Sequence, residues 1–410
     1  MLDLKRTPHG AVSGMIRIEG AQPKSAPATK GSALWSLGFR PFYLGASVFA
    51  SLSILLWTCQ YSGHLPVEFL HGSAWHAHEM LFGYTMAVVA GFLLTAVSNW
   101  TGKPTPRHGV LMALTALWVA GRVLVLTPLA VPAAIVNAAF PLALAVGIGK
   151  ALVQSRNRRN YFFLAILAFL SIAVLAFHLS HLDVLPWPER ASLQSALDMV
   201  LFIIAVIAGR VVPMFTNNGV PGAQATRNSM VERLALVGTL ALVGVDLVPA
   251  PRLLVAVIAF VLALVHATRL YLWKPQRTWR VPLVWVLHLA YAWIVVYLVL
   301  RGFAELGVVA PIFPLHALAI GAIGGMTIGM MTRTALGHTG RLLKAGRYEV
   351  ASFILIAIAA LARVFGGMWF PGAYAMTVML SGACWSVAFA LYAIHYWPVL
   401  SRVRVDGKPG

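Results

Sequence analysis

Charge is scarce in this 410-residue sequence: only 10% of its residues are charged, whereas 60% belong to the hydrophobic set. A soluble domain carries about 25% charged residues. So few charges cannot cover a surface that faces water, and the mean hydropathy of +0.80 points the same way. The composition therefore excludes an ordinary soluble protein and implies that most of the chain is surrounded by lipid.

Cysteine is nearly absent, with only Cys59 and Cys384 in the whole chain, both within or at the edge of apolar runs. No CxxC or CxxCH motif is present. This scarcity argues against disulfide frameworks, cysteine-based zinc sites and covalently attached c-type haem.

Acidic residues are also few, 12 against 31 Lys and Arg, which gives a net charge of +19. Such an excess can indicate nucleic acid binding. Here the basic residues form short clusters between long apolar runs, and no basic stripe is interleaved with aromatics. We therefore expect no nucleic acid partner and assign the basic residues to the orientation of membrane spans.

The hydropathy pattern predicts an all-α, polytopic membrane protein with about twelve spans of about 20 residues each. The predicted spans are 41–59, 78–98, 109–127, 131–150, 160–180, 191–212, 231–249, 252–272, 281–301, 312–333, 349–366 and 374–397. They form one domain, residues 35–398. Residues 1–34 lack a signal peptide core and are expected to be a disordered, basic cytoplasmic tail, and residues 399–410 a cytoplasmic C-terminal tail.

The distribution of basic residues supports this count and sets the orientation. With both termini in the cytoplasm, 26 of the 31 Lys and Arg residues fall on the cytoplasmic side, as the positive-inside rule requires. The exceptions on the outside are Arg122, Arg190, Arg252, Arg301 and Arg363. A missed or extra span would exchange the sides of every later loop and destroy this asymmetry.

Histidine is abundant for so apolar a chain, with 13 residues. The topology places five of them near the outer face, on three different spans: His76, His78, His178, His181 and His316. A cluster contributed by separate helices is how helix bundles build metal and cofactor sites, and imidazole suits haem iron, copper and zinc. A single histidine in a span is equally well explained as a packed residue bonded to a backbone carbonyl.

The segment WHAHEM (75–80) is the most informative part of this pattern. Residues two apart on a regular helix point about 200° apart, so His76 and His78 either lie on a loop before the helix or serve different centres. His76, Glu79 and Met80 share a helix face. The alternative is an interfacial cap, in which Trp75 anchors at the headgroups and Glu79 favours the helix N-terminus.

Two acids and two arginines are further candidates. Glu79 and Asp198 lie within spans on the outer half and are candidate proton carriers, or structural partners of nearby histidines. Arg210 and Arg333 lie at the inner ends of two spans. They are candidates to pair with haem propionates, or are simply positive-inside anchors.

The run GAIGGMTIGMM (321–331) combines glycine and methionine. Its glycines would allow close helix approach, or a flat cofactor against the backbone. Its methionines are favoured as apolar filler over Cu(I) ligands.

Four segments together resemble the NnrS family: LGFRPFYL (37–44), WHAHEMLFGYTMAVVAGFLLTAVSNWTG (75–102), GRVVPMFTNNG (209–219) and HALAIGAIGGMTIGMMTRTALGHTGR (316–341). The resemblance runs in order from about residue 35 to 397. It implies a twelve-span bacterial inner-membrane protein that contains haem b and copper and is linked to nitric oxide metabolism and protection against nitrosative stress. The motif histidines carried over are His76, His78, His316 and His338, with His288 as a further family position and His178 a weaker one.

Three functions remain open from the sequence. The first is an enzyme that reduces nitric oxide to nitrous oxide with quinol electrons, its metals held by histidines that include His76, His78, His288 and His316, and its protons supplied by Glu79 or Asp198. The second is a non-catalytic protein that handles or senses copper or haem. The third is a solute transporter, against which stands the gathering of imidazoles near one face, since transporter sites tend to lie at the midplane.

Overall fold

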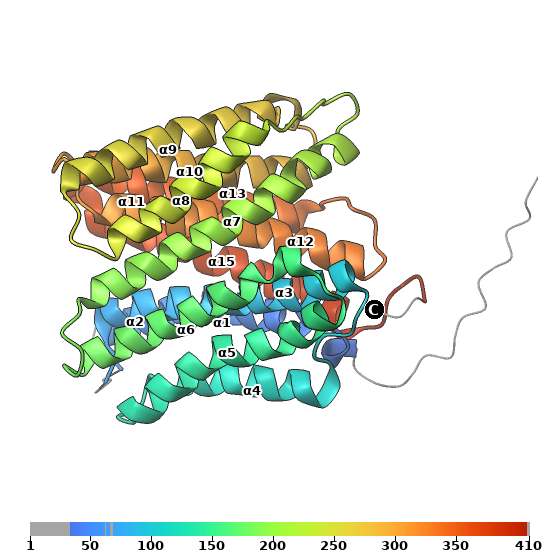
Figure 1. Cartoon of the computed structure of the whole chain (residues 1–410), viewed down its shortest axis with the longest axis horizontal. Coiled ribbons are helices and arrows are strands. Elements are labelled where there is room, and N and C mark those ends of the chain that lie inside the picture. The colour runs from blue at the N-terminus through green and yellow to red at the C-terminus, as the bar shows by residue number, and fades with distance from the viewer. Residues whose placement is uncertain (1–32, 62, 66–68, 408–410) are drawn as a thin grey trace, which may run out of the picture. The chain divides into compact units, whose positions relative to one another are not determined.

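The structure, a computed structural model, describes residues 33–61, 63–65 and 69–407. The disordered tail expected for residues 1–34 lies almost entirely outside this part; Ala33–Trp35 forms a short 3-10 helix, η1. All regular secondary structure in the described residues is helical. The main helices are α1 (Phe39–Tyr61), α2 (Gly72–His78), α3 (Met86–Thr101), α4 (His108–Leu124), α5 (Ala130–Gln154), α6 (Phe162–His181), α7 (Glu189–Gly219), α8 (Ser229–Asp246), α9 (Arg252–Leu272), α10 (Pro282–Glu305), α11 (Ile312–His316), α12 (Gly325–His338), α13 (Arg347–Leu361), α14 (Gly367–Trp369) and α15 (Tyr374–Ser401) (Figure 1).

Ten helical stretches in the described residues are long and apolar enough to cross a membrane, which confirms a multi-pass, all-α membrane protein. They coincide with ten of the predicted spans. The other two predicted spans correspond to α4, which has 17 residues, and α8, which has 18. Helix α8 is less apolar because it carries Glu232, Arg233 and Asp246.

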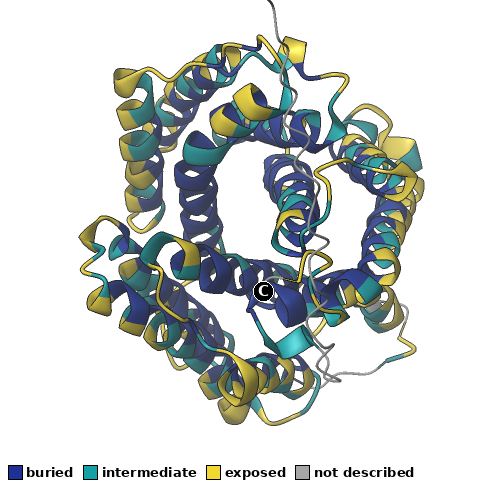
Figure 2. Cartoon of the chain, turned by 90° about the vertical axis from the view of Figure 1, so that its right-hand side faces the viewer, coloured by how far each residue is buried: buried dark blue, intermediate teal, exposed yellow. Residues whose placement is uncertain are grey.

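Large apolar side chains cover the outside of the bundle. Val146, Leu264 and Ile394 expose 70% or more of their surface. Figure 2 shows that the buried residues lie on the faces that the helices turn toward one another, whereas exposed residues lie on their outward faces. An outer face of this composition is suited to lipid rather than water.

The first and last long helices, α1 and α15, pack against each other. The guanidinium of Arg40 is fully buried and donates to the carbonyl oxygens of Leu400 (2.8 Å) and Arg402 (2.7 Å). Carbonyls at a helix C-terminus lack partners within the helix and carry negative partial charge, so a cation there is favourable. Trp385 also donates to the carbonyl of Ala50 at 3.0 Å.

The glycine-rich run of residues 321–331 serves helix packing. A Cβ on Gly321 would overlap Trp293 of α10, and one on Gly324 would overlap Trp385 of α15. Side chains therefore occupy the space that a flat cofactor would need. The methionines of the run pack in or against the hydrophobic core: Met326, Met330 and Met331.

Three of the long helices contain a π-helical segment. These are η2 (Glu79–Thr85), between α2 and α3, η5 (Ala317–Gly324), between α11 and α12, and η6 (Ala362–Gly366), between α13 and α14. A π-turn widens the helix and changes the direction in which side chains point, and such turns are frequent at functional sites. Each segment here begins beside or contains a residue of the site: η2 follows His78, η5 follows His316, and η6 contains Arg363.

Candidate metal and haem site

His78 and His178 face each other in the interior. Their Nε2 atoms lie 3.1 Å apart, and both side chains are fully buried. His78 is the last residue of α2, and His178 lies one turn before the end of α6. The fold thus brings together one imidazole from each of two predicted spans.

A carboxylate orients the first of these rings. Nδ1 of His78 lies 2.8 Å from Oε1 of Glu79, which fixes the Nδ1–H tautomer and leaves the Nε2 lone pair directed at His178. The same oxygen of Glu79 forms an ion pair with Nη1 of Arg122 at 3.1 Å. Gly83 makes room for this arrangement, since a Cβ there would overlap the Arg122 guanidinium.

Aromatic rings surround the histidine pair. Phe69 stacks on His178 with ring centroids 5.8 Å apart, and Phe82 and Phe177 each lie 5.3 Å from His78. The adjacent His181 is held apart by Glu189, at 3.0 Å. The pair is therefore enclosed by aromatic rings on one side and backed by the Glu79–Arg122 ion pair on the other.

A second group forms around His76. His76 and His316 lie within electrostatic range of each other and of Arg363. His76 packs against Trp57 with ring centroids 5.0 Å apart. Nδ1 of His76 and Nη1 of Arg363 are buried without a hydrogen-bond partner among the described residues. Nδ1 of His316 bonds to the carbonyl oxygen of Ile312 at 2.8 Å, so a ligand would meet Nδ1 of His76, Nε2 of His316 and Nη1 of Arg363.

The HxH motif is divided between these two groups. His78 turns to α6, whereas His76 packs against Trp57 of α1. The carboxylate of Glu79, which the sequence placed on one helix face with His76 and Met80, bonds to His78. The π-helix begins at Glu79, and its carboxylate pairs with His78 instead.

The described residues contain no group of three or more His, Cys, Asp or Glu side chains placed to hold a metal ion. Any metal would therefore have at most two of these ligands at either histidine group as it stands.

Two other predicted histidines lie in separate environments. His288 on α10 meets the hydroxyl of Thr216 on α7, at 2.8 Å from its Nε2 atom. His338, at the end of α12, lies 3.4 Å from the amide of Asn99 and packs near Phe39. Neither residue joins the groups around His76 and His78.

The two predicted propionate-binding arginines have other partners. Arg210 donates to the side-chain oxygen of Asn160 at 2.8 Å and lies over the ring of Trp100. Arg333 lies 3.8 Å from the ring centroid of Phe215. Both contacts suit anchoring at the inner ends of α7 and α12.

Asp198 belongs to a different polar network. It accepts hydrogen bonds from Tyr297 (2.9 Å) and from Gln194 (3.1 and 3.2 Å), and it interacts with Asp246 and Arg301. These partners come from α7, α8 and α10. The structure therefore separates Asp198 from Glu79.

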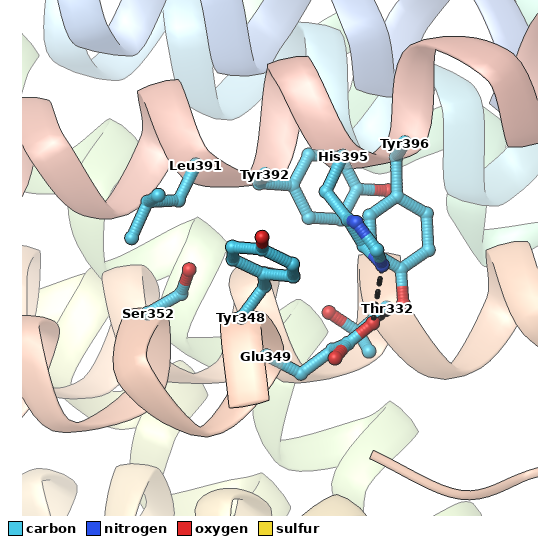
Figure 3. A pocket seen from close by; sticks show the side chains of 8 residues that line it. All are labelled: Thr332, Tyr348, Glu349, Ser352, Leu391, Tyr392, His395 and Tyr396. Atoms are coloured by element: carbon cyan, nitrogen blue, oxygen red, sulfur yellow. Dashed lines mark hydrogen bonds and ion pairs between the residues drawn. The ribbon is translucent and has the colours of Figure 1, made fainter. Parts of the chain in front are cut away.

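A further acid, Glu349, holds α13 against α15 (Figure 3). Its carboxylate accepts from the hydroxyl of Tyr396 and the backbone N–H of Gly346, both at 2.8 Å, and lies 3.3 Å from Nε2 of His395. Figure 3 shows these side chains pointing toward one another around a narrow crevice. With an N-terminal capping bond and two side-chain partners, Glu349 serves to fasten the helices.

Sequence reasoning overlooked the arginines of these sites, although the signal was present. Three of the five basic residues on the predicted outer side, Arg122, Arg301 and Arg363, are buried within the helices. Each departs from the positive-inside pattern because it pairs with polar groups in the interior rather than anchoring a loop. A basic residue on the predicted outer side of the membrane, against the positive-inside rule, was therefore a usable marker of a buried site.

The comparison with protein families matches residues 33–404 to the family described as NnrS protein. None of the curated proteins compared matches the chain. Because the match covers nearly the whole sequence, the chain belongs to the NnrS family, a group of haem- and copper-associated membrane proteins linked to the nitric oxide response.

Proposed function

We propose that this NnrS-family protein is a haem- and copper-containing protein of the bacterial inner membrane that reduces nitric oxide to nitrous oxide, with electrons from quinol. Two molecules of nitric oxide, two electrons and two protons would give one nitrous oxide and one water. The observation that carries this proposal is the buried pair of His78 and His178, enclosed by aromatic rings and backed by Glu79.

The donor atoms at this pair fit copper. Imidazole nitrogens bind copper readily, so His78 and His178 would hold the ion between them. The Nε2 atoms of His78 and His178 are 3.1 Å apart. Glu79 occupies the position of the carboxylate that commonly orients a metal-bound histidine.

The second group fits haem. Histidine is a common axial ligand of haem iron, and His76 and His316 are partly buried imidazoles within electrostatic range of each other. The unpartnered Nη1 of Arg363 suits a propionate carboxylate. Arg363 thus takes the role for which Arg210 and Arg333 were the candidates. His288 and His338 would contribute to cofactor binding only indirectly, through the helices that they join.

Haem and copper, when bound, would supply the electrons and the positions at which nitric oxide is held. The protein's own side chains would control access to the site and hold the protons. Phe69, Phe82 and Phe177 exclude water and admit an uncharged ligand. Oε2 of Glu79, buried and lacking a donor among the described residues, is a place to hold a proton beside His78. Asp198 would hold another proton on α7.

Consumption of nitric oxide by the purified full-length protein tests this function. In detergent with a quinol analogue, we expect consumption above the rate of an equal concentration of free haem. His78→Ala and His178→Ala should abolish it, whereas His395→Ala, which changes a half-exposed histidine elsewhere, should retain it. A wild-type rate no higher than that of free haem would rule the enzyme out.

A second candidate, non-catalytic handling of copper, has one observation in its favour. Neither histidine group in the described part of the chain offers a third His, Cys, Asp or Glu ligand. A site with two imidazole ligands would release copper more readily than a site with more ligands. Copper exchange with a chelator in minutes, combined with no nitric oxide consumption, would identify this function.

A further inference from the structure

The network around Asp198 contains more buried negative charge than its cation can neutralise. Asp198 on α7 and Asp246, the last residue of α8, neighbour the same guanidinium: Arg301 donates to Asp246 and to the hydroxyl of Tyr297 (3.4 Å), which in turn donates to Asp198 at 2.9 Å. Arg301 on α10 donates to Asp246 at 2.6 Å and to Glu305 at 2.9 Å. One guanidinium thus faces three carboxyl groups, while Arg252 on α9, 3.9 Å from Glu305, is 76% exposed.

One oxygen in this network lacks a partner. Oδ2 of Asp246 is buried and receives no hydrogen bond from the described residues, although the side chain is only 8% exposed. Three nearby donors among the described residues are already engaged. Tyr297 and Gln194 donate to Asp198, and Arg301 donates to the other oxygen of Asp246. A buried carboxylate oxygen without a donor is costly.

A single proton would resolve both the excess charge and the missing hydrogen bond. When two carboxyl groups share a buried site, both cannot ionise without strong repulsion, so the pair retains one proton between them. That proton would bond the two side chains together. We propose that Asp198 and Asp246 form a proton-binding site, at which one exchangeable proton is shared by the two carboxyl groups.

The surrounding groups favour a proton over a metal cation. Hard cations require several oxygen ligands, but the groups around Asp198 are donors: the Tyr297 hydroxyl, the Gln194 amide and the Arg301 guanidinium. These would repel a cation and take up the oxygens that it needs. The site lies at the end of α8, whose last residue is Asp246, and draws its other groups from α7 and α10.

This inference extends the proposed role of Asp198 and rests on it in part, but it requires no substrate and no metal. It is therefore testable even if nitric oxide reduction fails. Helices α7, α8 and α10 hold the site, whereas the pair of His78 and His178 is held by α2 and α6.

Infrared spectroscopy of the purified full-length protein measures the shared proton through the carbonyl stretching band of a protonated carboxylic acid, which shifts in heavy water. We expect Asp198→Asn and Asp246→Asn each to remove the same part of this band. The double variant should remove no more than either single variant, because one proton serves both residues. Glu349→Gln, in a separate buried network, should leave that part of the band in place.

Two results would overturn the proposal from these variants. If either aspartate variant left the band intact, the pair would hold no shared proton. If the losses of the single variants added in the double variant, the two carboxyl groups would be protonated independently. A measurement on the wild-type protein guards against unfolded variants: exchanging potassium for sodium in the buffer should not change the band, and its loss in sodium would show a cation site instead.

Discussion

The Nε2 atoms of His78 and His178 lie 3.1 Å apart although the two residues are 100 positions apart in the sequence. Glu79 fixes the tautomer of His78, so its Nε2 atom is an acceptor. His178 can then either donate a hydrogen bond to it or join it in binding a metal ion. The two rings cannot both be charged, because two imidazolium groups at this distance would repel strongly in an apolar interior.

The first prediction concerns copper at this pair. His78→Ala and His178→Ala should each lower the copper content of the reconstituted protein from about one ion to near zero, since one imidazole cannot hold the metal alone. Elemental analysis after removal of free copper measures this. His395→Ala is the matched control. Undiminished copper in both variants would show that the metal lies elsewhere.

The second prediction concerns the carboxylate behind the pair. Glu79→Gln keeps the shape of the side chain but removes its charge. Loss of such an orienting partner typically weakens metal binding 10- to 100-fold, and we expect a loss of that size in a competition titration with a copper chelator. Glu349→Gln, at a different buried acid, should leave the affinity unchanged. Equal affinity in Glu79→Gln and wild type would mean that this carboxylate does not support the metal.

The third prediction separates the two histidine groups. His76→Ala and His316→Ala should abolish the haem absorption spectrum, whereas His78→Ala should leave it in place. The reason is that His76 packs against Trp57 of α1, whereas His78 faces His178 of α6. Spectra of the reduced and oxidised protein provide the measurement. A spectrum lost in His78→Ala but kept in His76→Ala would reverse the assignment of the groups.

Most of the fold was predictable because lipid imposes simple rules. A span must be long, apolar and internally hydrogen-bonded, and ten of the helices meet that description. Helix α8 is an exception to the rule that a span must be apolar. Its Glu232 and Asp246 are balanced by arginines on neighbouring helices, Arg269 and Arg301, so it tolerates charges that a hydropathy window penalises.

The site was predictable in part. Hydropathy gave the spans that carry His78 and His178, but not the direction in which each side chain points. That direction depends on π-turns, such as the one that begins at Glu79, and no simple spacing of residue types encodes them. The partners of Asp198 could not be predicted from the sequence either, because Asp246 lies on another helix and comes near it only through tertiary packing.

The fourth prediction concerns Gly83. A Cβ at this position would overlap the Arg122 guanidinium and crowd Glu79. Gly83→Ala should therefore lower the free energy of unfolding by about 1–3 kcal/mol, the usual cost of overfilling a packed interior. Gly149→Ala is the control, because its Cβ would make only ordinary contact with Leu164 at 3.6 Å. Equal stability of the two variants in a detergent unfolding titration would contradict the tight fit at Gly83.

The fifth prediction concerns the buried ion pair at the other end of α8. Arg269 is 1% exposed, donates to Glu232 at 2.9 and 2.5 Å, and also bonds to the hydroxyl of Tyr291 at 2.9 Å. Arg269→Gln would leave the Glu232 carboxylate largely without its cation. Breaking a buried pair typically costs 3–5 kcal/mol, and we expect about that loss in the free energy of unfolding.

The same carboxylate supplies its own control for this last prediction. Arg227 also reaches Glu232, at 3.3 Å, but its side chain is 49% exposed. Water screens such a pair, which is worth about 0–1 kcal/mol. Arg227→Gln should therefore unfold at nearly the same denaturant concentration as the wild type. If Arg269→Gln and Arg227→Gln lost equal stability, burial would not explain the contribution of Arg269. The Arg269–Glu232 pair would then be worth no more than an exposed ion pair.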